Sequence, residues 1–191
     1  KIANLEGKEK LLTGSLPTGI KQRLALGTAV IHSPSIVFLD EPTGGVDPIE
    51  RRNFWNLIND LSSEGTTVFV TTHYLDEAEF CNRILLIDAG KIIAGGSPKE
   101  LKEKYITTTI LEIECDRTID ALTLLEASNY FDSTTIFGNY IHVKLKKNTG
   151  EDEAKQFIHK ILSENKIKEL RIDKISPTLE DVFITLLEKK N

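Results

Sequence analysis

The 191 residues suffice for one medium-sized domain or two small ones, and 40% hydrophobic and 28% charged residues are ordinary for a soluble globular protein. The formal net charge of −5 is spread evenly, so neither half has the basic excess of a nucleic-acid-binding protein. No apolar run approaches the roughly 20 residues of a membrane helix. Cys81 and Cys115 stand outside any CxxC pattern, which predicts reduced thiols rather than a disulfide or a zinc site.

Strands and helices alternate over the first 105 residues. The apolar runs 35–40 and 66–73 predict two parallel strands buried on both faces. The Ala89-Gly90 pair predicts the turn of a hairpin over 83–96. Helices are predicted over four further segments: 21–32, 48–65, 74–81 and 97–105. This order indicates an α/β layer with a parallel sheet.

Two of these helices have a predicted apolar face. Pro48 at the start and Gly65 at the end mark 48–65 as a capped amphipathic helix. Its face repeats at helical spacing and consists of Phe54, Leu57, Ile58 and Leu61. In helix 21–32, which Pro34 ends, the predicted face consists of Leu24, Gly27, Thr28 and Ile31.

After Tyr105 the pattern changes. The predicted order becomes β-α-β-β-α-β, which is the ferredoxin-like arrangement. Its segments are strand 107–115, helix 117–129, two strands flanking Gly138-Asn139, helix 151–165 and strand 167–175. A last helix follows, with an apolar face of Leu179, Val182, Phe183, Leu186 and Leu187. We therefore predict an α/β domain over 1–105 and a small ferredoxin-like α+β domain over 106–191.

Two adjacent acids, Asp40 and Glu41, follow the apolar run 36–39. Adjacent carboxylates at the end of a buried strand repel each other and lose hydration, so a cation or a reaction usually accounts for them. The pattern is that of a Walker B site. Asp40 would hold Mg²⁺ through water, and Glu41 would position or deprotonate the attacking water. The alternative is a strand end with two solvated acids in a turn.

One strand later, His73 follows the predicted strand of residues 67–72. The carboxyl ends of parallel strands share one edge of a sheet, so His73 and Glu41 are expected at the same edge. There His73 would donate a hydrogen bond to a phosphate oxygen and steady the attacking water; the alternative is an ordinary loop histidine. Between them, Gly45 lets the backbone bend, and Asp47 can hydrogen-bond locally or across an interface.

Upstream, "LPTGIKQRLAL" (16–26) places a glycine-containing turn directly before a helix. The N–H groups and the positive dipole end of a helix N-terminus suit a phosphate. The same pattern is also that of an ordinary helix start after a proline turn.

Taken together, these motifs resemble those of the ATP-binding subunit of ABC transporters. "IVFLDEPTGGVDP" (36–48) is similar to the Walker B segment and D-loop, and "TTHYLDEAE" (71–79) to the switch-histidine loop. "RILLIDAGKIIAGGSPKEL" (83–101) is similar to the strands and helix that close the domain, and "LPTGIKQRLAL" occupies the place of the signature. The tail "PTLEDVFITLL" (177–187) is similar, more loosely, to the carboxyl-terminal extension of ABC-2 type exporter ATPases.

The resemblance implies a subunit that hydrolyses ATP with Mg²⁺ and powers an export transporter. Its partners would be a transmembrane permease subunit and a second ATPase subunit, at the cytoplasmic face of the membrane, with no nucleic acid. The hydrolytic half of each site would consist of Asp40, Glu41 and His73. The half facing a partner's ATP would consist of Leu16, Thr18, Gly19, Gln22, Gly45 and Asp47.

The sequence departs from the family pattern in two ways. Pro17 and Thr18 stand where a serine and a glycine precede the second glycine of the signature, and Pro17 has neither a hydroxyl nor an N–H group. Thr18 could replace the serine. The phosphate loop G-x-x-x-x-G-K-S/T and the Q-loop are absent. We therefore expect a carboxyl-terminal part of such a subunit, inactive by itself.

Two other functions remain open at this stage. A non-hydrolysing, degenerate or regulatory module is favoured by Pro17 and opposed by the intact Glu41 and His73. A soluble cassette protein of translation or DNA repair is opposed by the acidic charge balance and the exporter-like tail.

Overall fold

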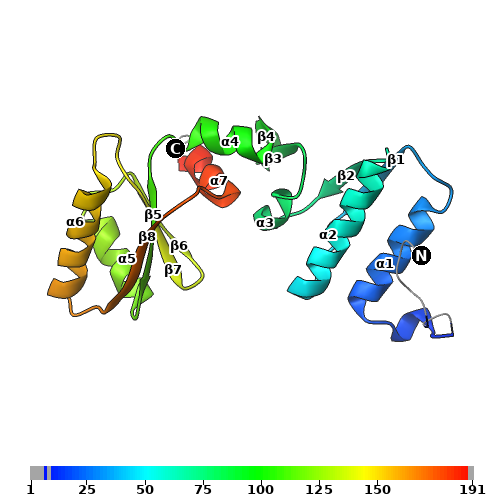
Figure 1. Cartoon of the computed structure of the whole chain (residues 1–191), viewed down its shortest axis with the longest axis horizontal. Helices are drawn as coiled ribbons and strands as arrows, with labels where there is room; N and C mark the ends of the chain where they lie inside the picture. The colour runs from blue at the N-terminus through cyan, green and yellow to red at the C-terminus, as the bar shows by residue number, and fades with distance from the viewer. Residues whose placement is uncertain (1–6, 8–9, 189–191) are drawn as a thin grey trace. The chain divides into compact units, whose positions relative to one another are not determined.

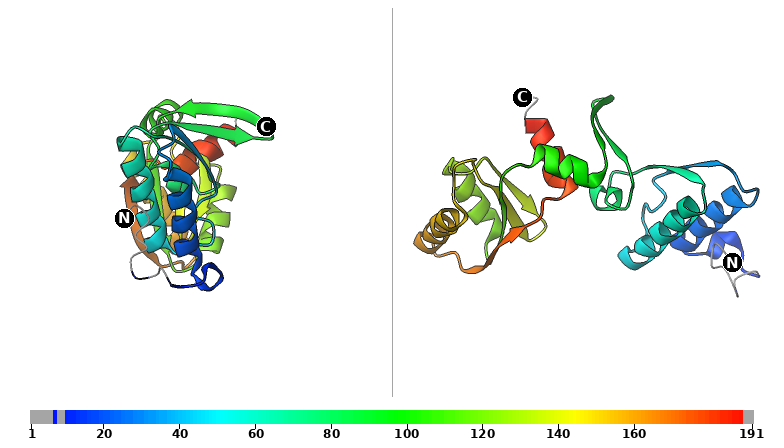
Figure 2. Two further views of the ribbon diagram at one scale, coloured as in Figure 1. Left: turned by 90° about the vertical axis from the view of Figure 1, so that its right-hand side faces the viewer. Right: turned by 45° about the horizontal axis from the view of Figure 1, so that its top comes forward.

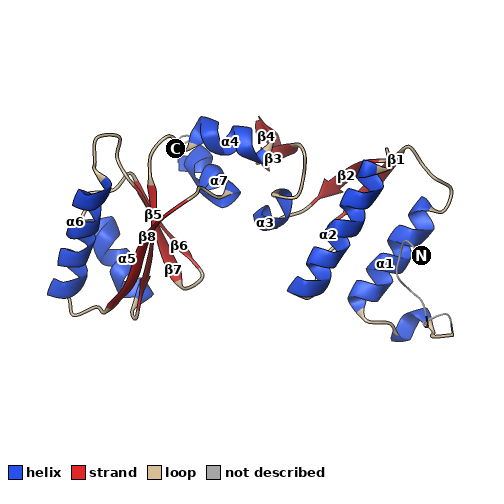
Figure 3. Cartoon of the chain, in the orientation of Figure 1, coloured by secondary structure: helices blue, strands red, loops and turns tan. Residues whose placement is uncertain are grey.

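The computed structural model describes residues 7 and 10–188, so residues 1–6, 8–9 and 189–191 lie outside the description. The chain divides into two compact units, Lys1–Asn82 and Arg83–Asn191, which are described separately (Figure 1, Figure 3). Within the described residues no helix combines the length and the apolar character needed to cross a membrane.

The first unit is built on a pair of parallel strands. In chain order its elements are η1 (Thr13–Ser15), α1 (Thr18–Val30), β1 (Ile36–Asp40), α2 (Pro48–Ser63), β2 (Thr67–Thr71) and α3 (Leu75–Ala78). Strands β1 and β2 pair in register from Ile36 opposite Thr67 to Asp40 opposite Thr71. Both strands therefore end at the same edge, as the sequence predicts.

One face of the β1–β2 pair is buried and the other is exposed. Val37 belongs to a core with residues of both longer helices: Leu26, Val30, Phe54, Trp55, Ile58 and Leu61. On the opposite face Phe38 is 75% exposed and contacts Phe69 with a ring separation of 5.7 Å. The prediction of strands buried on both faces is therefore wrong for the described residues. Both packing helices cover a single side, and no other described element covers the second one.

The buried face of α1 is also not the predicted one. Its buried residues are Arg23, Leu26 and Val30, whereas Ile31 is 83% exposed and Thr28 is exposed. Apolar residues occur all around this helix, so their spacing does not define one face. Arg23 is buried because its guanidinium forms an ion pair of 2.6 Å with Glu50 of α2. The side of α1 that carries Arg23 therefore faces α2.

The second unit contains a hairpin and a four-stranded sheet. Its elements are β3 (Ile84–Asp88), β4 (Lys91–Gly96), α4 (Pro98–Tyr105), β5 (Ile110–Cys115), α5 (Thr118–Ala127), β6 (Ser133–Phe137), β7 (Tyr140–Lys144), α6 (Glu151–Glu164), β8 (Glu169–Ile175) and α7 (Leu179–Glu188). The turn of the β3–β4 hairpin has positive φ at Ala89 (48°) and Gly90 (73°), which suits a two-residue hairpin turn. The predicted hairpin is thus confirmed.

The four-stranded sheet has the antiparallel order β6-β7-β5-β8. With the crossover helices α5 and α6, this order confirms the predicted ferredoxin-like arrangement. Figure 2 shows α5 and α6 side by side on one face of the sheet. Their core there includes Leu111, Ile113, Leu125, Ile141, Val143, Ala154 and Ile158. Alternate residues of β7 face the other way, toward α7.

Helix α4 packs against α7. Both helices therefore belong to the second unit, together with the β3–β4 hairpin, and this unit begins at Arg83. The domain boundary predicted near 105–107 stays a prediction.

Candidate active site

The carboxyl edge of the β1–β2 pair brings Asp40 and Thr71 together. The two residues are opposite each other in the parallel register, and the Thr71 hydroxyl donates a hydrogen bond to Asp40 Oδ1. Asp40 is exposed to solvent. An exposed carboxylate beside a hydroxyl is a set of hard oxygen donors at the sheet edge.

Glu41 leaves the strand in an unusual conformation. Its N–H still donates to the Thr71 carbonyl at 3.0 Å, and its own carbonyl accepts from the Gly44 N–H at 3.1 Å. Its φ is +42°, in the left-handed region that a non-glycine residue rarely adopts. This conformation belongs to the tight turn that follows β1, which the Glu41 carbonyl and the Gly44 N–H close.

Glu41 and His73 face each other at the same edge. His73 Nδ1 lies 3.1 Å from Glu41 Oε1, with the two side chains 58% and 53% exposed. The His73 ring packs beside Tyr74 with a centroid distance of 4.0 Å. With Nδ1 directed at the carboxylate, Nε2 is the ring nitrogen that can serve a bound group. The two sequence segments predicted to converge therefore do so.

Asp47 and Gly45 shape the turn between β1 and α2. The Asp47 side chain accepts hydrogen bonds from the N–H groups of Ile49 (3.1 Å) and Glu50 (3.0 Å), so it caps the N-terminus of α2. Gly45 is exposed and has a φ of +70°, which glycine adopts without strain. Of the two possibilities that the sequence offered for Asp47, a local hydrogen bond and a contact across an interface, the chain by itself shows the local hydrogen bond.

The start of α1 carries the other predicted residues. Leu16 is buried, Thr18 is exposed, and Gly19 and Gln22 are half-buried. A Cβ atom at Gly19 would lie 3.3 Å from Val46, so the first turn of α1 lies close to the β1–α2 turn. Among the described residues no hydrogen bond or ion pair joins this turn of α1 to Asp40, Glu41 or His73. The predicted residues therefore form two separate groups.

Two polar residues of this site, Thr71 and Glu77, are not predicted from the sequence. Thr71 is recognisable only from its register opposite Asp40. Glu77, in α3, is fully buried and accepts hydrogen bonds from the hydroxyls of Thr43 (2.5 Å) and Thr72 (2.9 Å). The acidic stretch "LDEAE" contains Glu77, but nothing in the spacing distinguishes it from its exposed neighbours Asp76 and Glu79.

The donor set at the edge fits a magnesium ion better than a transition metal. Within residues 7 and 10–188, no cluster of three or more His, Cys, Asp or Glu side chains could hold a metal ion. Mg²⁺ is usually held by one or two carboxylates, together with waters and substrate phosphates. Asp40, with the adjacent Thr71 hydroxyl, meets that requirement.

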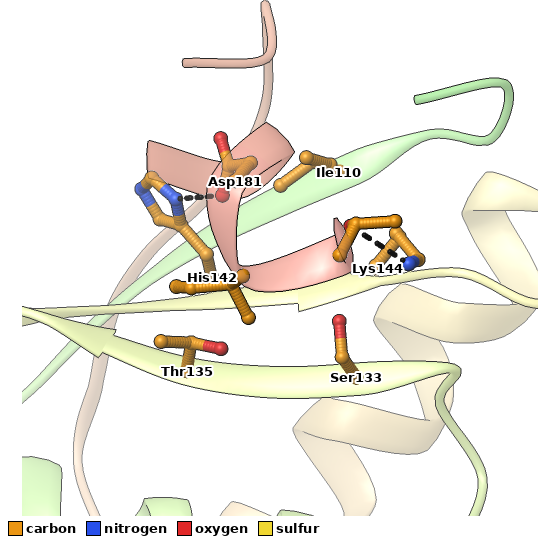
Figure 4. Close-up of a pocket in the computed structure, with 8 residues that line it drawn as sticks. Ile110, Ser133, Thr135, His142, Lys144 and Asp181 are labelled. Carbon is orange, nitrogen blue, oxygen red and sulfur yellow. Dashed lines mark hydrogen bonds and ion pairs between the residues drawn. The ribbon is translucent and has the colours of Figure 1, made fainter. Parts of the chain in front are cut away.

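A second polar cluster lies under α7 in the second unit (Figure 4). It lines a small pocket of about 10 Å³, room for about one water molecule. The buried His142 ring lies between Asp181 of α7 (Nδ1, 3.1 Å) and Glu112 of β5 (Nε2, 3.3 Å), and it stacks on Phe137. Lys144 contacts Asp132 at 2.8 Å and the Thr185 hydroxyl of α7 at 3.1 Å.

The charges of this second cluster satisfy one another. Burial opposes the charged imidazole, but Asp181 and Glu112 together outweigh it and raise the pKa of His142. Burial likewise opposes ionisation of Asp181, yet hydrogen bonds from His142 and Thr178 lower its pKa. The His142 ring between the carboxylates of Asp181 and Glu112 ties α7 to the sheet, which is a structural arrangement.

The chain is similar in sequence to a known family and to known transporter proteins. Residues 96–187 match the family described as "ATP-binding protein DrrA1-3-like, C-terminal domain". The probable multidrug ABC transporter ATP-binding protein YbhF of Escherichia coli (strain K12) is 58% identical over 90 residues. That match covers 47% of this chain and 16% of YbhF.

A longer match extends over parts of both units. The Nod factor export ATP-binding protein I of Burkholderia pseudomallei (strain K96243) is 35% identical over 159 residues, which cover 78% of this chain and 52% of that protein. Among solved structures, cbiO1 from Clostridium perfringens, part of the ABC transporter complex cbiONQ, is 28% identical with a TM-score of 0.50. The match covers 54% of this chain and 42% of the cbiO1 chain. The chain thus spans about half or less of the length of these relatives.

Proposed function

We propose that this chain, which belongs to the ATP-binding proteins of ABC transporters, supplies the hydrolytic residues of a subunit that powers a membrane exporter. The observation that carries the proposal is the Glu41 carboxylate 3.1 Å from His73 at the edge that also carries Asp40. The names of the relatives, a multidrug transporter protein and a Nod factor export protein, support export as the process.

The residues of the edge have distinct roles in ATP hydrolysis. Glu41 accepts a proton from the attacking water, whose oxygen forms a bond to the γ-phosphorus as the bond to ADP breaks. In its doubly protonated form His73 donates from Nδ1 to Glu41 and from Nε2 to a γ-phosphate oxygen. Asp40 and the Thr71 hydroxyl would hold Mg²⁺, which would neutralise phosphate charge.

The start of α1 serves the ATP of a second subunit in this proposal. Its residues form a group separate from the hydrolytic edge, and the first N–H groups of a helix have no partner within the helix. Leu16, Thr18, Gly19 and Gln22, with Gly45 and Asp47 of the adjacent turn, would form the half-site that faces the partner's ATP. The partners are a second ATPase subunit and a transmembrane permease, at the cytoplasmic face of the membrane.

The Glu41→Gln variant of the complete subunit tests the proposal. Glutamine keeps the shape of the side chain and removes the base, so turnover should fall about 10²-fold or more while ATP still binds. Steady-state ATPase assays and calorimetry with ATP measure the two quantities. The matched control is Glu64→Gln, an exposed residue at the end of α2. Turnover by Glu41→Gln at the parental rate contradicts the proposal.

A non-hydrolysing module is the second candidate, and Pro17 favours it. Pro17 occupies the N-cap of α1 with no side-chain capping hydrogen bond, so it adds no donor where the family signature has a serine. This candidate predicts a complete subunit that binds ATP but does not hydrolyse it in the presence of its permease.

A further inference from the structure

Glu77 is a fully buried acid whose contacts come from three different segments. Its Oε1 accepts from the Thr43 hydroxyl at 2.5 Å, and its Oε2 accepts from the Thr72 hydroxyl at 2.9 Å. The Arg51 guanidinium of α2 forms an ion pair with the same carboxylate, Nε to Oε1 at 3.3 Å. Thr43 is also buried. A single carboxylate thus joins the turn after β1, the start of α2 and the end of β2.

Stability alone does not account for a carboxylate in this position. Burying a charged group costs free energy that its partners repay only in part, and an apolar replacement is often as stable. The contacts of Glu77 do, however, fix a geometry. Each carboxylate oxygen holds one threonine, and the rigid carboxylate plane sets the distance between the two segments.

Those two segments are the ones that carry the Glu41–His73 pair. Thr43 follows Glu41 by two residues, in the turn closed by the Glu41 carbonyl and the Gly44 N–H. Thr72 directly precedes His73. Among the described residues no hydrogen bond or ion pair joins Glu77 to Glu41 or His73, so we expect an effect of Glu77 on the pair to pass through the backbone of these segments.

Two further contacts continue from Glu77 toward the His73 ring. The Thr72 hydroxyl also accepts from the Tyr74 N–H at 3.0 Å. The Arg51 guanidinium lies 4.2 Å over the Tyr74 ring, which packs beside His73 at 4.0 Å. Tyr74 is therefore held from two directions by groups that contact Glu77.

We propose that Glu77 is a positioning residue for hydrolysis, which holds the Glu41 and His73 segments in register through Thr43 and Thr72. The inference rests on the proposed function. A misplacement of about 1 Å from a change away from the reacting atoms can cost about 10²-fold in rate. Loosening this buried anchor should therefore slow turnover without weakening ATP binding.

The test uses the complete subunit with its permease and the variants Glu77→Gln, His73→Ala and their combination. Glutamine retains one carbonyl oxygen, so one threonine can keep its acceptor. We expect kcat to fall about tenfold, with KM changed less than twofold. In the His73→Ala background Glu77→Gln should have no further effect on kcat, because the geometry it maintains is already lost. A purely structural role would lower activity equally in both backgrounds, which would overturn the inference.

Thr72→Val and Glu64→Gln complete the experiment. Thr72→Val removes one donor at nearly constant shape and should lower kcat three- to tenfold, which keeps the inference testable if Glu77→Gln does not fold. Glu64→Gln makes the same chemical change on the surface of this unit and should leave kcat unchanged. If Glu41→Gln is inactive while Glu77→Gln and Thr72→Val keep the parental kcat, only this inference fails. If Glu41→Gln itself is fully active, the proposed function fails.

Discussion

Two histidines of this chain lie at the same distance from a carboxylate, one pair in each unit. His73 Nδ1 lies 3.1 Å from Glu41, with both side chains more than half exposed. His142 Nδ1 lies 3.1 Å from Asp181, with side chains 6% and 8% exposed, and its other nitrogen faces Glu112. The buried pair has its hydrogen-bonding capacity filled by the protein. The exposed pair keeps a nitrogen and a carboxylate oxygen for a ligand.

The difference in exposure between these two pairs shows that a histidine–carboxylate pair does not by itself define a reactive site. The two pairs differ in the structural elements that carry their side chains. Glu41 and His73 come from the segments that follow two parallel strands at one edge of the pair. His142 comes from the middle of β7 and meets a helix packed over it. Exposed polar groups of the candidate site in the first unit should therefore affect turnover, and buried polar groups of the second unit should affect stability.

The exposed Thr18 hydroxyl gives the largest expected effect beyond the pair itself. A hydrogen bond to a charged phosphate oxygen contributes roughly 1.5–3 kcal/mol, so Thr18→Val should slow the complete dimer about ten- to a hundredfold. The thermal unfolding midpoint should not change. The matched control is Thr28→Val on the same helix, because the Thr28 hydroxyl donates to the Ala25 carbonyl of that helix.

The variant Pro17→Ser restores the serine of the family signature. It tests whether Thr18 replaces that serine. If Thr18→Val is neutral and Pro17→Ser raises turnover strongly, Thr18 does not replace the missing serine. In that case the degenerate-site hypothesis gains support.

The buried His142 should instead appear as a pH dependence of stability. Its pKa is raised above 6.5 in the folded protein, so its stabilising effect is complete below pH 6.5 and is lost as the pH rises through the folded pKa. Between pH 6 and pH 8.5 the second unit should lose a few degrees of thermal stability.

Hydrogen exchange in α7, corrected for intrinsic rates, locates this loss. His142→Gln should abolish the excess opening of α7 at high pH relative to pH 6, and turnover per folded molecule should not change. The control is His159→Gln, because His159 pairs with Glu169 at the surface of the same unit. If both variants keep the pH dependence of α7, the buried pair does not dock this helix. The other charged groups around His142 are Glu112, Lys144 and Arg171. Arg171 forms an ion pair with Glu112, so it does not replace His142 as a partner of Asp181.

Sequence alone predicted the four-stranded sheet of the second unit and its two crossover helices. Its strands have one apolar face and its turn at Gly138-Asn139 is short, so the order of elements defines the ferredoxin-like arrangement. The convergence of Glu41 and His73 was also predictable, because parallel strands end at one edge.

Other features depend on contacts that spacing does not encode. Glu77 is 34 residues from Thr43, and no local pattern separates a buried acid from the exposed acids beside it. The face of α1 was mispredicted because a buried ion pair, Arg23 with Glu50, outweighed a weak apolar pattern. The exposed Phe38 and Phe69 have a buried-strand sequence, but helices cover only their opposite face.

The central claim is that Glu41 and His73 act as one catalytic unit, and a double-mutant cycle tests it most directly. Steady-state kcat is measured for the complete subunit with Glu41→Gln, His73→Ala and both changes. Each single change should lower kcat about 10²-fold, and the double variant should be no slower than about the slower single variant, because each change disables the same unit. Losses that multiply to about 10⁴-fold, or a single variant with the parental kcat, would contradict the claim.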